Sequence, residues 1–477
     1  IGVLMPLILG TNSIKDTGYN VANSCRFDDG DSAYMTKTPD SAGNRDRWTF
    51  SCWVKRGNLS GVYQTIISAS GGSADDTDYF YFNADNTLHV HLVASGSAYG
   101  TLYTNRKFRD ISAWYNIILV YDSGNGTAGD RLIMYINGVR ETSFSASSFP
   151  DQNADSVMTL GSGGIDVGRD GSSSGSGYLD GYLAETVLID GLALDATSFG
   201  EFDDSGIWKP IDVSGLTFGT NGFYLDFKDS SNLGNDANGG TDFGETNIAA
   251  TDQSTDTCTN NFATWNSLIK TTASLVEGNL KYTTPGSNPV FGSLSTIGVT
   301  SGKWYAELNY TSGSSHKLVL GVADETFQNG NTTSSYDLGK SGTTSSIAYV
   351  VNTGAYRINN SNTSWGSAGG DGQIINMAID RDNGKIYFGV NGTWGNSSNP
   401  ASNSGGIPTT ALDSSTNWFW GITADTSGTS DVGELNFGSP SYSESGGETD
   451  GNGYGNFAHA PPSGYFCLNL KNLAEFG

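Results

Sequence analysis

Carboxylate pairs are the first residues to examine, because retaining glycoside hydrolysis needs two carboxyl groups about 5 to 5.5 Å apart. On a strand, such a pair would stand at alternate positions. The nearest candidates are Glu201 with Asp203 and Glu448 with Asp450, and both pairs lie in stretches rich in Gly and Asp. Neither pair continues into a third acid at the next same-face position. We therefore expect no enzymatic activity, and we interpret these carboxylates as solvated loop residues.

Two histidines stand at a spacing that could contribute to a metal site. His89 and His91 lie in the run LHVHL, so they share one face of any strand formed there. No third ligand can be located from the sequence, whereas Leu88, Val90 and Leu92 occupy the opposite, apolar face. We interpret the two histidines as solvent-facing residues of a half-buried strand. The other two histidines are isolated and support no nucleophilic triad.

Three aromatic residues could form a recognition surface, because Tyr and Trp rings stack on sugars and dominate binding patches. Tyr356 and Trp365 lie in the segment 352–372, and Trp394 lies in the turn after Val390. Both segments are rich in Asn, Gly and Ser, which is typical of connecting loops. We expect the three rings to be at least partly exposed or to lie in an intersubunit contact. Packing at the rim of the domain is the alternative.

The elements that must position these residues are strands. The chain has 477 residues, of which 65 are Gly and 12% are aromatic, and its hydrophobic fraction of 36% is sufficient for ordered cores. Helical periodicity is scarce, and short apolar or alternating runs recur between clusters of Gly, Asn, Asp and Ser. This pattern is typical of β-sandwiches and barrels. The sequence therefore predicts an all-β fold.

Charge and cysteine content exclude several kinds of partner. The formal net charge of −25 repels phosphate backbones and anionic lipid headgroups, so we expect no nucleic-acid partner. The apolar run 1–9 is too short to span a bilayer, so no membrane insertion is expected. Four cysteines are too few for a disulfide framework in a chain of this length, and we interpret them as buried or incidental thiols.

The predicted strands fall into two sets. The first set comprises 49–55, 64–69, 78–83, 87–94, 114–121 and 131–137, and the second comprises 303–310, 317–323, 346–352, 373–380, 385–390 and 417–424. The run 116–121 is apolar at nearly every position, which predicts a central strand covered on both faces. Between the two sets, the chain is rich in Asp, Asn, Gly and Thr, as in a linker.

One hairpin pattern occurs in both halves. An apolar strand ends in D-x-x-N-G at 122–126, and the next strand ends in Asn137-Gly138. The same order recurs at 380–384 and Asn391-Gly392. Asn-Gly favours the positive φ angles of tight hairpin turns. The two halves are therefore expected to share this local geometry, with chance similarity between Gly-rich hairpins as the alternative.

Longer motifs resemble two known families. The stretches FSCWVKRG at 50–57, RLIMYINGV at 131–139 and YLDGYLAETVLIDG at 178–191 resemble laminin-G-like and pentraxin-like domains of the concanavalin A type. GKWYAEL at 302–308 and DGQIINMAIDRDNGKIYFGVNGTW at 371–394 resemble the SPRY fold. These resemblances imply two jelly-roll β-sandwiches in series.

The predicted organisation along the chain follows from these motifs. It comprises an N-terminal arm at 1–15, a laminin-G-like sandwich at 16–228, a linker at 229–255, a SPRY-like sandwich at 256–440 and a C-terminal tail segment at 441–477.

The domain order and several connecting stretches together resemble structural proteins of tailed bacteriophages, particularly marine ones. The stretches are FGEFDDSGIWKP at 199–210, NGFYLDFKDSS at 221–231 and PPSGYFCLNLKNL at 461–473. This resemblance implies a non-enzymatic protein of the virion surface, such as a fibre, spike or decoration protein. Its expected partners are other virion proteins, a host surface glycan and further copies of the chain. A secreted glycan-binding or glycan-hydrolysing protein and a cellular adhesin are the alternatives.

The laminin-G resemblance also implies that calcium could bind at the rim of the first sandwich. Ca²⁺ takes six to eight oxygen ligands. Asp75, Asp76 and Asp78 supply carboxylates densely, as does the stretch 226–238 (DFKDSSNLGNDAN), although neither has EF-hand spacing. Calcium at Asp75, Asp76 and Asp78 is thus one interpretation, and an ordinary Asp-rich turn is the other. No other cofactor is expected.

Overall fold

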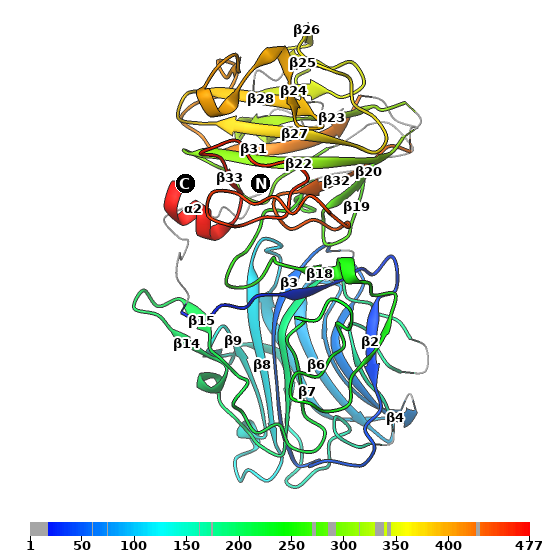
Figure 1. Cartoon of the computed structure of the whole chain (residues 1–477). Coiled ribbons are helices and arrows are strands. Elements are labelled where there is room, and N and C mark those ends of the chain that lie inside the picture. The colour runs from blue at the N-terminus through cyan, green and yellow to red at the C-terminus, as the bar shows by residue number, and fades with distance from the viewer. Residues whose placement is uncertain are drawn as a thin grey trace. The chain divides into compact units, whose positions relative to one another are not determined.

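The computed structural model describes residues 18–59, 61–73, 75–161, 163–172, 175–269, 273–284, 292–313, 315–329, 338–340, 345–425 and 430–477 (Figure 1). The predicted arm at 1–15 lies outside these residues. The chain divides into two compact units, Thr17–Thr259 and Asn260–Gly477. Among the described residues, no helix is long and apolar enough to cross a membrane.

The first unit is built from two eight-stranded sheets. The strands of one sheet are, in spatial order, β10 (Val139–Arg140), β9 (Leu132–Ile136), β8 (Trp114–Asp122), β3 (Arg47–Arg56), β13 (Gly181–Asp190), β1 (Ser24–Phe27) and β18 (Gln253–Ser254), with β16 (Phe223–Leu225) also pairing with β13. The strands of the other sheet are β11 (Phe144–Ser148), β7 (Ser97–Lys107), β6 (Thr87–Ala94), β5 (Asp76–Phe82), β4 (Gln64–Ser73), β12 (Ile165–Val167), β2 (Tyr34–Lys37) and β17 (Gly244–Thr246). A separate hairpin joins β14 (Gly200–Phe202) to β15 (Trp208–Pro210).

Side-chain alternation places the core of the first unit between its two sheets. Phe50 and Cys52 of β3 and Val90 of β6 are fully buried in one apolar cluster. The predicted central strand is confirmed, because β8 lies between β9 and β3 and its residues 116–121 are all buried.

The second unit also contains two main sheets. The larger one orders β19 (Ser274–Val276), β20 (Lys281–Thr283), β32 (Val432–Asn436), β22 (Lys303–Ser312), β27 (Gln373–Asp380), β28 (Lys385–Val390) and β29 (Thr393–Trp394), with β30 (Ile407–Pro408) pairing with β28 and β33 (Phe466–Cys467) with β22. The smaller one orders β21 (Ser293–Leu294), β31 (Trp418–Ala424), β23 (Leu318–Asp324), β24 (Ser346–Val350), β25 (Ala355–Ile358) and β26 (Ser361–Ser364). This unit also contains two short α-helices, α1 (Thr326–Asn329) and α2 (Leu470–Phe476), and the 3-10 turns η5 (Gly395–Ser397) and η6 (Pro400–Ser402).

The shared hairpin is present in both units. Asn137 and Gly138 have φ angles of 47° and 76°, and Asn391 and Gly392 have 47° and 75°. Positive φ at both central residues defines the type I′ turn, whose twist matches that of the flanking strands. The Asn-Gly prediction is therefore confirmed at both positions.

The prediction of a linker at 229–255 is wrong. Its residues add β17 to β2 of one sheet and β18 to β1 of the other, so they belong to the first unit. Asp256, just beyond it, forms an ion pair of 2.7 Å with Lys55, and both side chains are almost fully buried. Polar composition suggested a linker, but backbone pairing and this ion pair hold the segment in the sandwich. The predicted tail segment at 441–477 likewise contributes β33 to a sheet of the second unit.

Candidate functional site

Aromatic side chains line one face of the sheet formed by β4 to β7 in the first unit. In β5, Phe80 and Phe82 point into the core, and alternation turns Tyr79 and Tyr81 to the opposite face. In β6 the same alternation turns His89 and His91 to that face, away from the buried Leu88, Val90 and Leu92. β7 adds Tyr103, and Tyr63 stands immediately before β4. We call these six residues the aromatic face: Tyr63, Tyr79, Tyr81, His89, His91 and Tyr103.

The rings of the aromatic face are in mutual contact across the strands. The centroid of Tyr81 lies 5.7 Å from that of Tyr63 and 5.2 Å from that of His89. His89 stacks on Tyr103 at 3.8 Å. Tyr79 and His91 close the group, with their centroids 5.9 Å apart. The sheet thus presents a continuous aromatic surface that crosses the strand direction.

Hydrogen bonds hold His89 in this surface. Its Nε2 lies 2.9 Å from Oγ1 of Thr87, and its Nδ1 lies 3.2 Å from the hydroxyl of Tyr81. Burial lowers the pKa of both His89 and His91 from the usual 6.5, so both imidazoles are neutral at pH 7. The expectation of solvent-facing histidines is correct for the face. It is wrong for the exposure of His89, which is only 9% exposed because Tyr103 covers it.

A shallow pocket of about 180 Å³ opens at one end of the aromatic face. It is lined by Tyr63, Tyr79, Tyr81, Asn83 and Asp170. The Tyr63 hydroxyl donates to Asp170 at 3.1 Å and lies 2.6 Å from Oγ of Ser176. Burial raises the pKa of Tyr63 and of Tyr79, and the nearby Asp170 carboxylate raises both further. The pocket therefore offers ring faces, neutral hydroxyls, an amide and one carboxylate.

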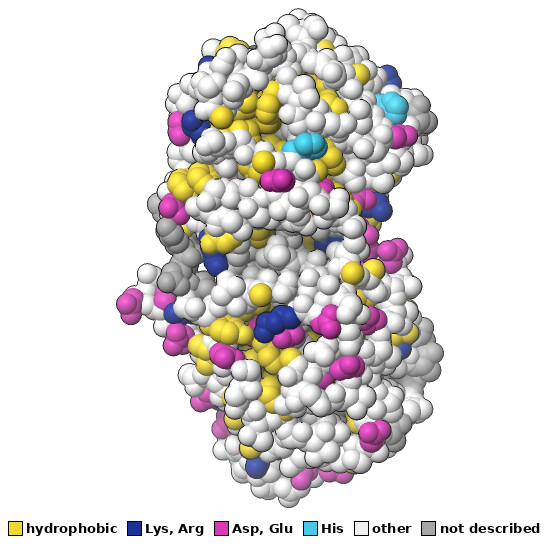
Figure 2. Space-filling view, in the orientation of Figure 1, with side chains coloured by type: hydrophobic (Ala, Val, Ile, Leu, Met, Phe, Trp, Pro, Cys, Tyr) yellow, Lys and Arg dark blue, Asp and Glu magenta, His cyan; other side chains and the backbone are white. Residues whose placement is uncertain are grey.

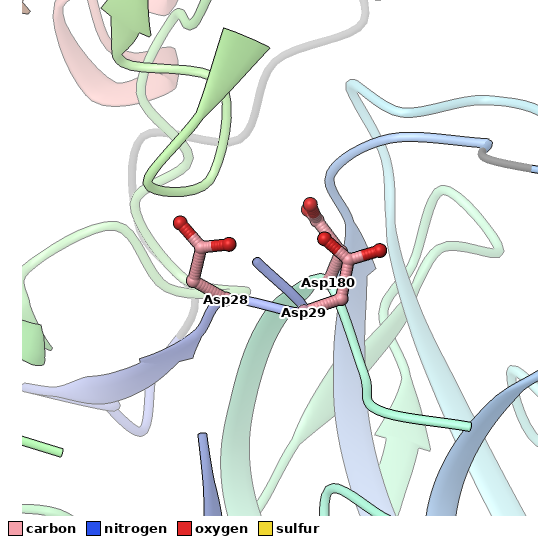
Figure 3. A group of neighbouring side chains, drawn as sticks. All are labelled: Asp28, Asp29 and Asp180. Carbon is pink, nitrogen blue, oxygen red and sulfur yellow. The ribbon is translucent and has the colours of Figure 1, made fainter. Parts of the chain in front are cut away.

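A group of three carboxylates lies elsewhere in the first unit (Figure 3). Asp28 and Asp29 follow β1, and Asp180 immediately precedes β13. One oxygen from each lies within 4.8 Å of the others. Burial raises the pKa of Asp180 well above its usual range, and the charges of Asp29 and Asp28 add to this effect. Asn58 donates to Asp180 from both its backbone and its side chain.

These three carboxylates supply oxygen atoms of the kind that divalent cations bind. An acidic cluster of this kind also occurs without an ion, with one carboxyl group protonated to relieve the repulsion.

The prediction of a calcium site at Asp75, Asp76 and Asp78 is not supported, because the structure does not bring these three carboxylates together as a ligand group. Asp78 is fully buried, and its oxygens accept hydrogen bonds from the Tyr99 hydroxyl, the Ser156 hydroxyl and two backbone N–H groups. Asp76 accepts from the backbone of Ser95. Alternation turned Asp78 into the core, where it anchors a loop.

The three predicted binding aromatics of the second unit do not form one surface. Trp365 is 6% exposed and its indole donates to the carbonyl of Phe388 at 2.9 Å, so it is a core residue, and its predicted exposure is wrong. Tyr356 is half-buried against Trp365, with ring centroids 5.9 Å apart. Trp394 is half-buried in a different apolar cluster, 6.3 Å from Tyr305.

The two candidate acid pairs for hydrolysis, Glu201 with Asp203 and Glu448 with Asp450, include carboxylates that bind other groups of the protein. Glu201 pairs with Lys209 at 3.1 Å in the β14–β15 hairpin. Asp203 accepts from two backbone N–H groups of its own turn. Asp450 is buried, contrary to its interpretation as a solvated residue, and accepts from Asn472.

Sequence reasoning missed the aromatic face. The run 79–82 (YFYF) alternates two tyrosines with two core phenylalanines, and this signal was available. Tyr63 and Tyr103 carry no such signal, because only the pairing of four segments brings them beside Tyr81.

Comparisons with known proteins support the architecture. Residues 28–196 match the family described as the concanavalin A-like lectin/glucanases superfamily. The comparison with curated proteins found no match.

Solved structures similar to the chain include the SPRY domain of human HERC1, with 13% identity, a TM-score of 0.28, and coverage of 36% of this chain and 96% of that one. A proposed carbohydrate-binding protein of Bacteroides ovatus has 16% identity, a TM-score of 0.34, and coverage of 48% and 60%. The SAP-like pentraxin of Limulus polyphemus has 14% identity and a TM-score of 0.28, and the match covers 37% of this chain and 80% of that one. The predicted all-β fold class is confirmed by the antiparallel sheets of both units, and the family match supports the concanavalin A-like sandwich over residues 28–196.

Proposed function

We propose that this chain is a non-enzymatic carbohydrate-binding protein whose sugar site is the aromatic face and its pocket. The observation that carries the proposal is the continuous group of six rings beside a pocket with polar groups. Aromatic rings offer large, rigid contact area for the apolar faces of sugars, and hydroxyl, amide and carboxylate groups supply the directional hydrogen bonds. The match of residues 28–196 to a superfamily that includes lectins supports the same function.

The non-enzymatic part of the proposal is supported by the composition of the pocket. Its described lining contains one carboxylate, Asp170, whereas glycoside hydrolysis employs a pair of carboxyl groups. The site therefore has groups for binding a sugar but lacks, among the described lining residues, a second acid to act on it.

The biological setting that we propose is the surface of a tailed-bacteriophage particle, with attachment to a host surface glycan or assembly with other virion proteins as the role. This part depends on the sequence resemblance of the domain order and the connecting stretches. The surface chemistry suits such a setting, because Figure 2 shows scattered acidic side chains on a largely uncharged polar face, which favours solubility. We further propose that the chain forms a homo-oligomer.

The test of the sugar site is glycan binding by the whole chain and by two variants. Wild-type protein should bind a subset of neutral polysaccharides on an array, and Tyr81→Ala should weaken that binding at least about fivefold, since stacking on an aromatic ring contributes on the order of 1 kcal/mol or more. Tyr135→Ala is the matched control, because Tyr135 is a half-buried tyrosine of β9 in the other sheet. Equal binding by wild type and Tyr81→Ala would refute the site.

The virion setting is tested separately. Mass spectrometry of purified particles should detect this chain at a constant copy number relative to a capsid or tail protein. Its absence from washed particles of the phage whose genome encodes it would overturn the virion proposal and leave the sugar site unaffected.

A further inference from the structure

The pocket beside the aromatic face carries one formal charge. Of its five described lining residues, three are tyrosines, one is Asn83 and one is Asp170. The tyrosines are neutral at pH 7, because burial raises the pKa of each above the usual 10. A ligand in the pocket therefore meets a negative charge with no lysine or arginine among the described lining residues.

Asp170 is held rigidly at this position. It is 7% exposed, and its backbone pairs with that of Ser176 across the loop. Its Oδ2 accepts from the Tyr63 hydroxyl at 3.1 Å and its Oδ1 from the backbone N–H of Ser172 at 2.8 Å. An ionised carboxylate has about four acceptor positions, so the hydrogen bonds from the described residues leave room for donors from a ligand.

The cation next to Asp170 in the sequence does not offset its charge. The guanidinium of Arg169 forms an ion pair of 3.2 Å with Asp166. Its central carbon lies 3.5 Å from the ring centroid of Tyr34, on β2. Arg169 is thus directed to a different acid and a different ring, and Asp170 remains the charge that faces the pocket.

From this arrangement we infer that the pocket selects uncharged sugars and excludes acidic ones, with Asp170 as the residue that determines this specificity. The inference rests on the proposed function, since it names the class of glycan that the same site takes. Sugar hydroxyls are donors that a carboxylate accepts. A uronate, sulfate or sialate group would bring a second negative charge into a partly desolvated pocket, where like charges repel more strongly than in water.

The experiment compares matched neutral and acidic oligosaccharides. The probes are trimers of glucose and glucuronate, galactose and galacturonate, and mannose and mannuronate, so that each pair differs in oxidation at one carbon of each sugar. Dissociation constants are measured by titration calorimetry at pH 7 for the whole chain. In at least one pair the neutral trimer should bind about tenfold or more tightly than its acidic partner.

The variant Asp170→Asn should reduce this preference to about twofold or less, mainly by strengthening binding of the acidic trimer. Asp151→Asn is the matched control, because it makes the same charge change at an exposed position of the first unit and should leave the preference unchanged. Thermal unfolding of both variants checks the fold. If Asp170→Asn does not fold, the test is the salt dependence of the wild type. Raising the salt concentration from about 0.02 to about 0.5 M should reduce the ratio of the dissociation constants of the acidic and neutral trimers, because salt screens the repulsion.

The outcomes separate the two claims. Equal or tighter binding of the acidic trimers, a preference unaffected by Asp170→Asn, or one insensitive to salt would overturn the inference while the sugar site stands. Binding of no trimer in either series would count against the proposed function itself, and the inference would fall with it.

Discussion

The imidazole of His89 lies flat on the phenol ring of Tyr103, with centroids 3.8 Å apart and planes inclined by 10°. This stack joins β6 to β7 on the aromatic face, and the neutral imidazole also contacts Thr87 and Tyr81 through its two nitrogens. His89 therefore contacts three residues of β5 to β7 through its ring face and both ring nitrogens.

We predict that acidification weakens the first unit through His89. Burial lowers the pKa of His89 in the folded state below the usual 6.5, so the unfolded chain binds the proton more readily. The contribution of His89 to the free energy of unfolding should accordingly fall as the pH drops below about 6.5. Urea unfolding of the wild type and of His89→Gln, followed by tyrosine and tryptophan fluorescence from pH 8 to 5, isolates this contribution as the difference between the two proteins. The wild type should lose stability relative to His89→Gln towards pH 5, and a difference that does not change with pH would contradict the role of His89.

The opposite pH dependence is expected from Glu185. This residue stands in the β-bulge of β13 with a φ of 46° and accepts from the Tyr224 hydroxyl at 2.8 Å. Burial raises its pKa from 4.5 to about 7. The folded state thus binds the proton more tightly, and this stabilisation is complete below pH 4.5 and is lost as the pH rises through about 7.

Glu185→Gln tests that prediction. The amide keeps an acceptor for Tyr224 but cannot ionise. As the pH rises from 5 to 8, the free energy of unfolding of the variant should therefore increase by on the order of 2 to 3 kcal/mol relative to that of the wild type. Urea unfolding at the two pH values gives the difference. If the free energies of unfolding of variant and wild type differ by the same amount at pH 5 and pH 8, Glu185 does not titrate between these two pH values.

Trp365 should behave as a core residue. Trp365→Ala removes a side chain that is 6% exposed and a hydrogen bond to the Phe388 carbonyl, so we expect a loss of about 3 to 5 kcal/mol in the stability of the second unit. Tyr356→Ala should cost clearly less, because Tyr356 is half-buried. Chemical unfolding of both variants provides the comparison. A loss below about 1 kcal/mol for Trp365→Ala would restore the original expectation of an exposed ring.

The end of the first unit can be located by truncation. A fragment of residues 17–259 should fold by itself, with a cooperative thermal transition, because it contains both sheets of that unit. A fragment of residues 17–228 lacks β17, β18 and Asp256, and leaves Lys55 buried without its acid. Breaking a buried pair costs about 3 to 5 kcal/mol, so the shorter fragment should be markedly less stable or unfolded. Equal stability of the two would reinstate 229–255 as a linker.

Local sequence patterns were sufficient for much of the fold. Apolar alternation predicted β6 at Thr87–Ala94, β27 at Gln373–Asp380 and β28 at Lys385–Val390 at their observed bounds. The Asn-Gly pairs at 137–138 and 391–392 predicted the turns, because few residues adopt two consecutive positive φ angles. Such features depend on neighbours within a few residues, and the sequence displays those directly.

The assembly of the site was decided by the tertiary structure. Tyr63, Tyr81 and Tyr103 come from three separate segments, and only the antiparallel pairing of β4 to β7 places their rings in one surface. The same holds for Trp365, which was predicted to be exposed, and for Asp78, which was predicted as a calcium ligand. Both side chains are buried under residues distant in the chain. Strand alternation assigns a side chain to a face, whereas whether that face is covered, and by which segment, depends on pairings between residues far apart in the sequence.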